Sequence, residues 1–358
     1  MTAIDVLLRQ ALASGLGSAA SLEIGDTQGA LHTWYDGRLS ADASAALLEP
    51  DDLFDLASLT KVMATTAVAL RLSEEGRLHL EDAVGAWVPA WHRRRDRSSV
   101  TIVDLLAHQS GLPAHQPLYR IARERHAYVE AICDIALAHE PRAGSIYSDL
   151  GFILLVEILE RAGGRPFRSQ VRDLLRAVGA AHTDFLPSMA ARARSVATGF
   201  DAYRRRVLHG EVHDPNAWAL GGVAGHAGLF GCAADVGAFA RAILKGLLGG
   251  STPIASSDRL RAMARRAGAP GSSRALGWDT MLPTSSCGER MSTAAIGHTG
   301  FTGTSLWIDP TRELYVVLLT NRVATTSGEA SIRALRRAVH DAALDAFDRG
   351  VLRARRPS

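Results

Sequence analysis

The chain has 358 residues, of which 47% are hydrophobic, and its formal net charge at pH 7 is only +3. This length allows one large domain or two of ordinary size. The small net charge argues against a nucleic-acid partner. Arginine runs occur at residues 93–95, 204–206 and 353–356. Acidic residues lie between these runs, so we expect the arginines to be solvated surface residues.

Hydrophobic periodicity places strands near both ends of the chain and helices between them. The predicted elements, in chain order, are a helix at 3–14, strands at 19–24 and 30–35, helices at 58–76, 101–107, 127–138, 148–162, 168–178 and 234–248, strands at 292–297, 304–308 and 314–319, and a helix from about 331.

This order of elements predicts an α/β fold of the α+β type. Its antiparallel sheet combines N- and C-terminal strands, terminal helices flank the sheet, and a mostly helical region is inserted. We expect residues 1–75 and 215–358 to form the sheet domain and residues 76–214 to form the insertion. Active sites often lie where two such parts meet, so we expect the site at their interface.

No apolar run is long enough to span a bilayer, and the first twelve residues carry Asp5 and Arg9 inside an apolar stretch, unlike a signal peptide. Cys133, Cys232 and Cys287 lack the spacing of a metal site, and three thiols cannot all pair with one another. We therefore expect a cytoplasmic protein with reduced cysteines and no metal.

Lysine occurs only at Lys61 and Lys245, against 38 arginines. A surviving lysine suggests a task that arginine cannot perform, and one such task is to give up a proton. Lys61 lies three residues after Ser58, which would place a nucleophile one helical turn from its activator. In the first turn of an apolar helix, a lysine is costly unless it is paired or neutral. Chance spacing remains the alternative for this pair.

Two later segments offer further chemistry. Tyr147-Ser148-Asp149 follows a loop and begins a helix, so its tyrosine either presents a phenol to a cleft or packs as a half-buried ring. His298-Thr299-Gly300 follows a strand, where a glycine lets a substrate lie against the strand edge. An ordinary hairpin turn is the alternative for the second segment.

Taken together, Ser58-Leu59-Thr60-Lys61 and these two segments resemble the S-x-x-K, Y-x-N and K-T-G motifs of class C β-lactamases and related penicillin-binding proteins, peptidases and esterases. The resemblance spans about residues 4–345. Supporting stretches that match the same superfamily are residues 76–82, 105–113, 228–235 and 318–322. It implies a serine hydrolase that works through an acyl-enzyme without a cofactor. It is a poor guide to the substrate, because one scaffold serves several chemistries.

The resemblance makes Ser58 the acylated nucleophile, Lys61 its activating base and Tyr147 the carrier of protons to the leaving group. The backbone N–H groups of Ser58 and Phe301 would form the oxyanion hole. Thr299 and Gly300 of the third motif would line the substrate site beside them.

Two positions depart from the family pattern. His298 replaces the lysine of K-T-G, and Asp149 replaces the asparagine of Y-x-N. Both changes weaken the case for a dedicated β-lactamase, which holds its substrate with a fixed positive charge and an amide. His108 and His226 are candidate pocket residues, although a core histidine bonded to backbone explains His226 equally well.

We therefore expect hydrolysis of small acyl esters or D-amino-acid-type peptides and amides, with at most slow β-lactam turnover. The alternatives are a true β-lactamase or D-alanyl-D-alanine carboxypeptidase, an acyltransferase, and a binding module without turnover. An ordinary histidine pKa near 6.5 at His298 predicts that neutral esters are preferred over penicillins at pH 8, and that this preference narrows towards pH 6.

Overall fold

The computed structural model describes residues 2–325 and 328–352 and is built around one six-stranded sheet. Neighbouring strands are antiparallel in the order β2-β1-β11-β10-β9-β8, so strands from both ends of the chain share the sheet. Their bounds are β1 (Ala19–Gly25), β2 (Ala30–Gly37), β8 (Asp279–Thr280), β9 (Ile296–Thr299), β10 (Ser305–Asp309) and β11 (Leu314–Thr320).

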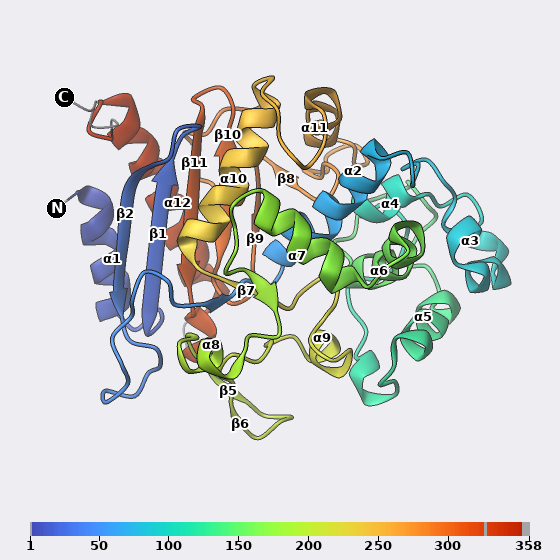
Figure 1. Cartoon of the computed structure of the whole chain (residues 1–358), viewed down its shortest axis with the longest axis horizontal. Helices are drawn as coiled ribbons and strands as arrows, with labels where there is room; N and C mark the ends of the chain where they lie inside the picture. The colour runs from blue at the N-terminus through green and yellow to red at the C-terminus, as the bar shows by residue number, and fades with distance from the viewer. Residues whose placement is uncertain (1, 326–327, 353–358) are drawn as a thin grey trace.

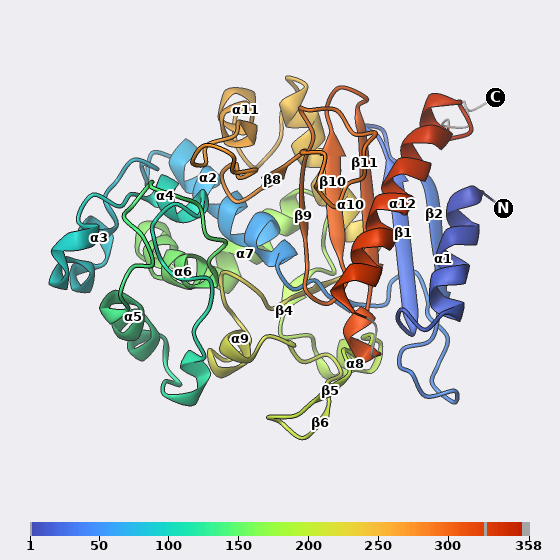
Figure 2. The same ribbon diagram turned by 180° about the vertical axis from the view of Figure 1, so that it is seen from behind.

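Helices cover both faces of this sheet (Figures 1 and 2). Helices α1 (Ala3–Ala13) and α12 (Glu329–Asp348) lie on one face, and α10 (Ala233–Leu247) lies on the other. Along β11, Val316 packs in the core under the terminal helices, whereas Val317 packs in the larger core on the opposite face. Alternate side chains of a strand point to opposite faces, and because both faces of the sheet are covered, β11 is buried along its whole length.

Most of the remaining α-helices gather beyond α10, on the side of the molecule away from the terminal helices, whereas α8 lies near the lower end of the sheet (Figures 1 and 2). These remaining α-helices are α2 (Ala67–Glu74), α3 (Val84–Trp87), α4 (Ile102–Leu106), α5 (Arg125–Asp134), α6 (Asp149–Gly163), α7 (Phe167–Ala177), α8 (Met189–Ala193), α9 (Pro215–Ala219) and α11 (Ser257–Ala264). Two small sheets complete the fold: β3 (Phe54–Asp55), β7 (Leu229–Gly231) and β4 (Asp184–Phe185), and the pair β5 (Phe200–Asp201) and β6 (Arg206–Val207).

The predicted architecture is confirmed: an antiparallel sheet of N- and C-terminal strands, flanking terminal helices and an inserted helical region. Several predicted boundaries differ; the helix expected at 127–138, for example, is α5 and ends at Asp134. The helix expected from Ser58 begins with a π-helical segment, Lys61–Thr66, before α2. The strand expected from Ser292 begins only at Ile296, because the backbone N–H and hydroxyl of Ser292 bond to the Asp309 carboxylate and hold a turn there.

The expectation of solvated arginine runs is wrong for one residue. Arg204 has a side chain only 2% exposed, which forms ion pairs with Asp201 and Glu211 and lies over the Trp218 ring. Residues 353–356 lie outside the described residues. Among the described helices, none combines the length and the apolar character needed to cross a membrane.

Candidate active site

The residues of the three sequence motifs meet at one cavity of about 650 Å³. The expected residues that line it are Ser58, Tyr147, His298, Thr299, Gly300 and Phe301. Three charged residues that the sequence analysis did not select also line it: Arg274, Asp279 and Arg322. Lys61 and Asp149 do not line the cavity, and Lys61 contacts both Ser58 and Asp149.

Ser58 is presented by a tight turn that follows β3. The residue before it, Ala57, has a positive φ of 46°, a conformation that costs a non-glycine residue free energy. The Asp55 carboxylate accepts the backbone N–H of Ala57 at 2.9 Å and so stabilises the turn. The π-helical segment that begins at Lys61 follows directly, and π-helical turns are frequent at functional sites.

Lys61 is fully buried, and its Nζ has three hydrogen-bond acceptors. They are the Asp149 Oδ1 at 2.7 Å, the Ser58 Oγ at 3.0 Å and the His226 carbonyl oxygen at 3.2 Å. Burial alone lowers the pKa of the Lys61 ammonium, but the Asp149 carboxylate and Tyr147 outweigh it and raise that pKa above its ordinary value. The sequence left open whether Lys61 is paired or neutral, and the structure favours a paired, charged lysine.

Asp149 is the partner that keeps this lysine charged. It is the first residue of α6, where the helix dipole also favours a negative charge. Burial raises the pKa of its carboxyl, but Lys61 and then His115 and His226 outweigh burial and hold that pKa far below its usual range. The substitution of aspartate for the family asparagine therefore adds a full negative charge 2.7 Å from Lys61.

Tyr147 lies between several charged and aromatic groups at the cavity wall. Lys61 Nζ lies 4.7 Å from its ring centroid, and the Arg274 guanidinium lies 4.8 Å from it. His108 packs against the ring with centroids 4.7 Å apart, and His298 packs against it at 5.7 Å. The ring is thus fixed beside two cations.

His298 is buried, and its Nδ1 lies 2.9 Å from the Thr299 carbonyl oxygen. Burial, and then the charges of Lys61 and Arg274, hold the pKa of His298 well below 6.5. The expectation that this residue becomes charged near pH 6 is therefore wrong. The imidazole is expected to stay neutral there, because burial disfavours its charged form and Lys61 and Arg274 would repel a third cation.

The proposed oxyanion donors are the backbone N–H groups of Ser58 and Phe301. Within residues 2–325 and 328–352, neither group donates to a protein acceptor. The turn that carries Phe301 is tied to the segment before Ser58, since the Thr302 hydroxyl donates to the Asp55 carbonyl at 2.7 Å and the Thr304 hydroxyl to the Leu56 carbonyl at 3.1 Å. Two free donors on two segments joined in this way fit an oxyanion hole.

Helix α12 supports the same turn from behind. The buried Arg336 guanidinium donates to the Gly300 carbonyl oxygen at 2.7 Å and to the Thr304 carbonyl oxygen at 2.9 Å. A Cβ added at Gly300 would lie 2.7 Å from the Leu56 carbonyl oxygen. Glycine at this position therefore allows the turn to approach the nucleophile segment closely.

The two histidines expected at the pocket do not line the cavity. His226 is buried, with its Nε2 2.7 Å from Asp214 Oδ1, so it is a core histidine paired with a carboxylate rather than with backbone. His108 has a positive φ of 59°, and its Nδ1 accepts the Ser148 N–H at 3.0 Å. Burial holds the pKa of His108 well below 6.5, so it supports Tyr147 as a neutral ring.

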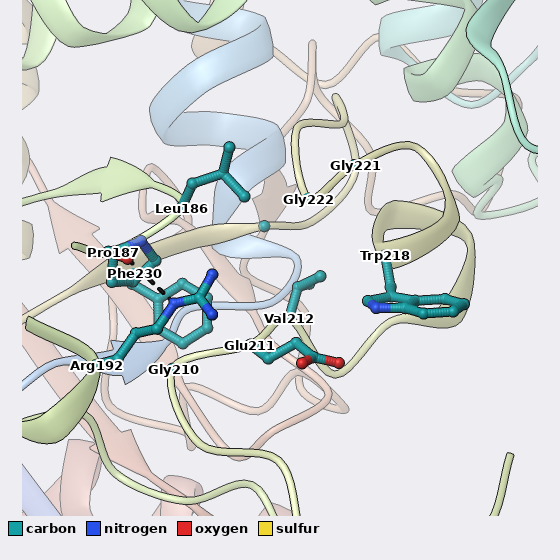
Figure 3. Close-up of a pocket in the computed structure, with 11 residues that line it drawn as sticks. Leu186, Pro187, Arg192, Gly210, Glu211, Val212, Trp218, Gly221, Gly222 and Phe230 are labelled. Carbon is teal, nitrogen blue, oxygen red and sulfur yellow. Dashed lines mark hydrogen bonds between the residues drawn. The ribbon is translucent and has the colours of Figure 1, made fainter. Parts of the chain in front are cut away.

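A second cavity of about 210 Å³ shares no lining residue with the first and is shown in Figure 3. Trp218 and Phe230 form apolar parts of its wall, and the Arg192 guanidinium donates to the Pro187 carbonyl oxygen at 3.2 Å. Its carboxylate, Glu211, is held in ion pairs with two arginines outside the cavity. The wall includes no serine, cysteine, lysine, histidine or tyrosine, so we place the chemistry in the larger cavity.

The Beta-lactamase family model matches residues 9–341 of the chain. The chain belongs to the beta-lactamase family. This confirms the resemblance drawn from the three motifs, and it makes the protein a serine hydrolase of the β-lactamase and penicillin-binding-protein type.

Several proteins with different names are similar to this chain. A protein of Escherichia coli (strain K12), provisionally named a D-alanyl-D-alanine carboxypeptidase, is 29% identical over 89% of this chain and 81% of its own. An N-acetylmuramyl-L-alanine amidase of Bacillus subtilis (strain 168) is 30% identical over 90% of this chain and 81% of its own. The solved structure of EstCE1, a hydrolase with promiscuous acyltransferase activity, has a TM-score of 0.77 at 20% identity and covers 95% of this chain and 97% of its own; this likeness shows the fold alone.

Proposed function

We propose that this protein hydrolyses carboxylate-bearing amides or peptides of the D-amino-acid type through an acyl-enzyme at Ser58, with slow turnover of β-lactams. The observation that carries the proposal is the Ser58–Lys61 pair, 3.0 Å apart, at a cavity that also contains Arg274. The carboxypeptidase and amidase names of the two similar proteins support an amide rather than an ester as the preferred bond.

The geometry favours a particular path for the proton of Ser58. A lysine ammonium has three N–H donors, and all three have acceptors here, so Lys61 holds no free lone pair in this state. We assign the removal of the Ser58 proton to Tyr147, with the Lys61 cation stabilising the phenolate. Ser58 Oγ then attacks the carbonyl carbon, and the Ser58 and Phe301 N–H groups bind the oxyanion.

The second half of the reaction uses the same groups. Tyr147 returns its proton to the leaving amine nitrogen as the amide bond breaks, which leaves the acyl group on Ser58 Oγ. A water molecule then gives its proton to Tyr147 and attacks the acyl carbon, and Ser58 Oγ departs with a proton from Tyr147. One water is consumed, and the products are a carboxylic acid and an amine.

Positive charge in the cavity points to a substrate carboxylate. Arg274 forms no ion pair within the described part of the chain, and Arg322 lines the same cavity over the Phe301 ring. Arginine presents a planar fork of donors that matches a carboxylate in geometry. These arginines replace the charge that His298 cannot supply, so the expected preference for neutral esters gives way to a preference for anionic substrates.

Intact-mass spectrometry tests the proposal directly. The wild-type protein should gain one acyl group from benzylpenicillin, and it should hydrolyse an N-acyl-D-alanyl-D-alanine faster than the C-terminal amide of that peptide. Ser58→Ala should abolish the adduct and the hydrolysis while the far-UV circular dichroism is unchanged. An adduct on another serine would overturn the assignment of Ser58, and equal rates on the acid and the amide would overturn the substrate class.

A further inference from the structure

We propose that His115 is a positioning residue that acts through Asp149 and, when protonated, restores a net positive charge beside Ser58. The proposal rests on the proposed function, because it concerns the charge that Tyr147 and a substrate carboxylate experience. Family members with asparagine at position 149 would hold a net charge of +1 at this place, whereas the Lys61–Asp149 pair is neutral overall. An imidazolium at His115 returns the local total to +1.

The two carboxylate oxygens of Asp149 face two different cations. Oδ1 lies 2.7 Å from Lys61 Nζ, and Oδ2 lies 3.8 Å from His115 Nδ1. The three residues therefore form a row from the nucleophile to the outer surface, where the His115 side chain is 44% exposed. Since Lys61 is fully buried, His115 is the member of this row that exchanges protons with solvent most readily.

The loop that carries His115 is fixed to the start of α6 by hydrogen bonds from Ser148 and Asp149. The backbone N–H of Asp149 donates to the Ala114 carbonyl oxygen at 2.9 Å, and the Ser148 hydroxyl donates to the Pro113 carbonyl oxygen at 2.8 Å. The imidazole is thus held near the carboxylate by its own backbone. A surface histidine that met Asp149 only by chance would not need these two contacts.

The charged groups around His115 favour its protonated form. Asp149 faces it from α6, and Asp214 faces it from the N-cap of α9, where His226 also contacts the Asp214 carboxylate. The contact with Asp149 raises the pKa of His115, partial burial lowers it, and Asp214 adds to the increase, so the pKa lies above its ordinary value. The extra charge is therefore present at pH 6 and is lost as the pH rises above that raised value.

A double-mutant cycle separates this role from a structural one. The variants are His115→Gln, Asp149→Asn and the double substitution, and the readout is kcat/KM for the N-acyl-D-alanyl-D-alanine between pH 5.5 and 8.5. In the otherwise wild-type protein, His115→Gln should lower kcat/KM about twofold to fivefold at pH 6, which is the range expected for a partly exposed ion pair. It should leave kcat/KM unchanged at pH 8.5. In the Asp149→Asn background it should have a smaller effect at pH 6, because no carboxylate links the imidazole to Lys61, and no effect at pH 8.5.

The control is His32→Gln, which breaks another histidine–aspartate pair, His32 with Asp5 at 2.9 Å, away from the cavity. It should leave the pH profile unchanged. An equal loss at both pH values, or the same loss in the Asp149→Asn background, would overturn the role of His115. Failure of the proposed function is a different result: wild-type protein that forms no acyl group on Ser58 with benzylpenicillin at any pH.

Discussion

At the scale of single residues, the geometry around Lys61 leaves no room for arginine. A planar guanidinium cannot direct donors to the same three acceptors from a fully buried position. Lys61→Arg should therefore misplace the cation that stabilises the Tyr147 phenolate and lower kcat/KM by about 10²–10⁴, the contribution of the proton transfer that Tyr147 performs. Lys245→Arg, on the exposed face of α10, is the matched control and should leave kcat/KM unchanged. A near-normal rate for Lys61→Arg would show that its ammonium does not organise the site.

Arg274 is the residue that should separate anionic from neutral substrates. Arg274→Gln should lower kcat/KM for benzylpenicillin and for the peptide acid by about 10- to 100-fold, since one charged hydrogen bond is worth about 1.5–3 kcal/mol, and should spare a neutral ester. Arg274→Lys retains the charge and should recover part of the loss. Arg259→Gln, at an arginine paired with Glu74 outside the cavity, is the control. A parallel loss on the ester would assign Arg274 to the positioning of Tyr147 instead.

His298 should not contribute to the pH dependence between pH 6 and 8, because its pKa is held well below that range. If the preference between a neutral ester and penicillin changes over this range, His298→Gln should leave the change intact and His115→Gln should remove it. The measurement is the ratio of the two kcat/KM values at both pH values. A change that disappears in His298→Gln would show that this imidazole is charged in the working enzyme.

Local spacing made part of the site predictable. Short motifs can be recognised in a single sequence, and they predicted Ser58, Lys61, Tyr147 and the His298–Gly300 segment. The charge of Lys61 depends on Asp149, 88 residues away, which no spacing reveals. Arg274 was missed because it lies in a loop without periodicity, and the path of that loop past Tyr147 is set by tertiary contacts.

At the scale of elements, the turn after β9 must approach the segment after β3 closely. A methyl group at Gly300 would clash with the Leu56 carbonyl oxygen and push the Phe301 N–H away from the nucleophile. Gly300→Ala should lower kcat about 10²-fold, the effect of a misplacement of about 1 Å. Gly328→Ala, where an added Cβ meets no atom within 4 Å, is the control. Equal kinetics in the two variants would exclude this turn from the oxyanion hole.

Elements with strong signals at their ends were predicted well. Thr101 accepts the Asp104 N–H as the N-cap of α4, and α6 begins after Ser148, as the sequence indicated. The strands β3, β4 and β7 were missed because two or three residues are too few to show a period of two. They form only because long-range pairing brings them together beside Ser58.

At the scale of the whole molecule, buried neutral histidines should make the protein sensitive to acid. Burial lowers the pKa of His340 to about 4, and it also lowers the pKa of His108, His213 and His298. The folded state then binds fewer protons than the unfolded chain below pH 6.5, so stability falls as pH falls. For His340 the effect reaches about 3 kcal/mol at most.

Asp55 opposes this trend, because burial raises the pKa of its carboxyl to about 6 and the folded state therefore binds an additional proton. His115, whose pKa is also raised, acts in the same direction as Asp55. The four buried histidines outnumber these two groups, so we expect Tm to fall between pH 6.5 and 5. Thermal unfolding of His340→Leu should show a shallower fall than wild type over that window. An unchanged slope would mean that His340 titrates normally in the folded protein.

The position of β1 in the sheet also affects how the protein is made. Its Ala20 lies opposite Thr320 of β11, so the middle of the sheet joins segments from near the two ends of the chain. At a synthesis rate of about 5–20 residues per second, roughly 15–60 s separate the appearance of the two strands. During that interval β1 lacks the neighbour on one edge and exposes apolar side chains that the finished protein buries. Newborn chains should therefore depend on chaperones until β11 emerges, and chains that stop before it should aggregate instead of persisting as partly active enzyme.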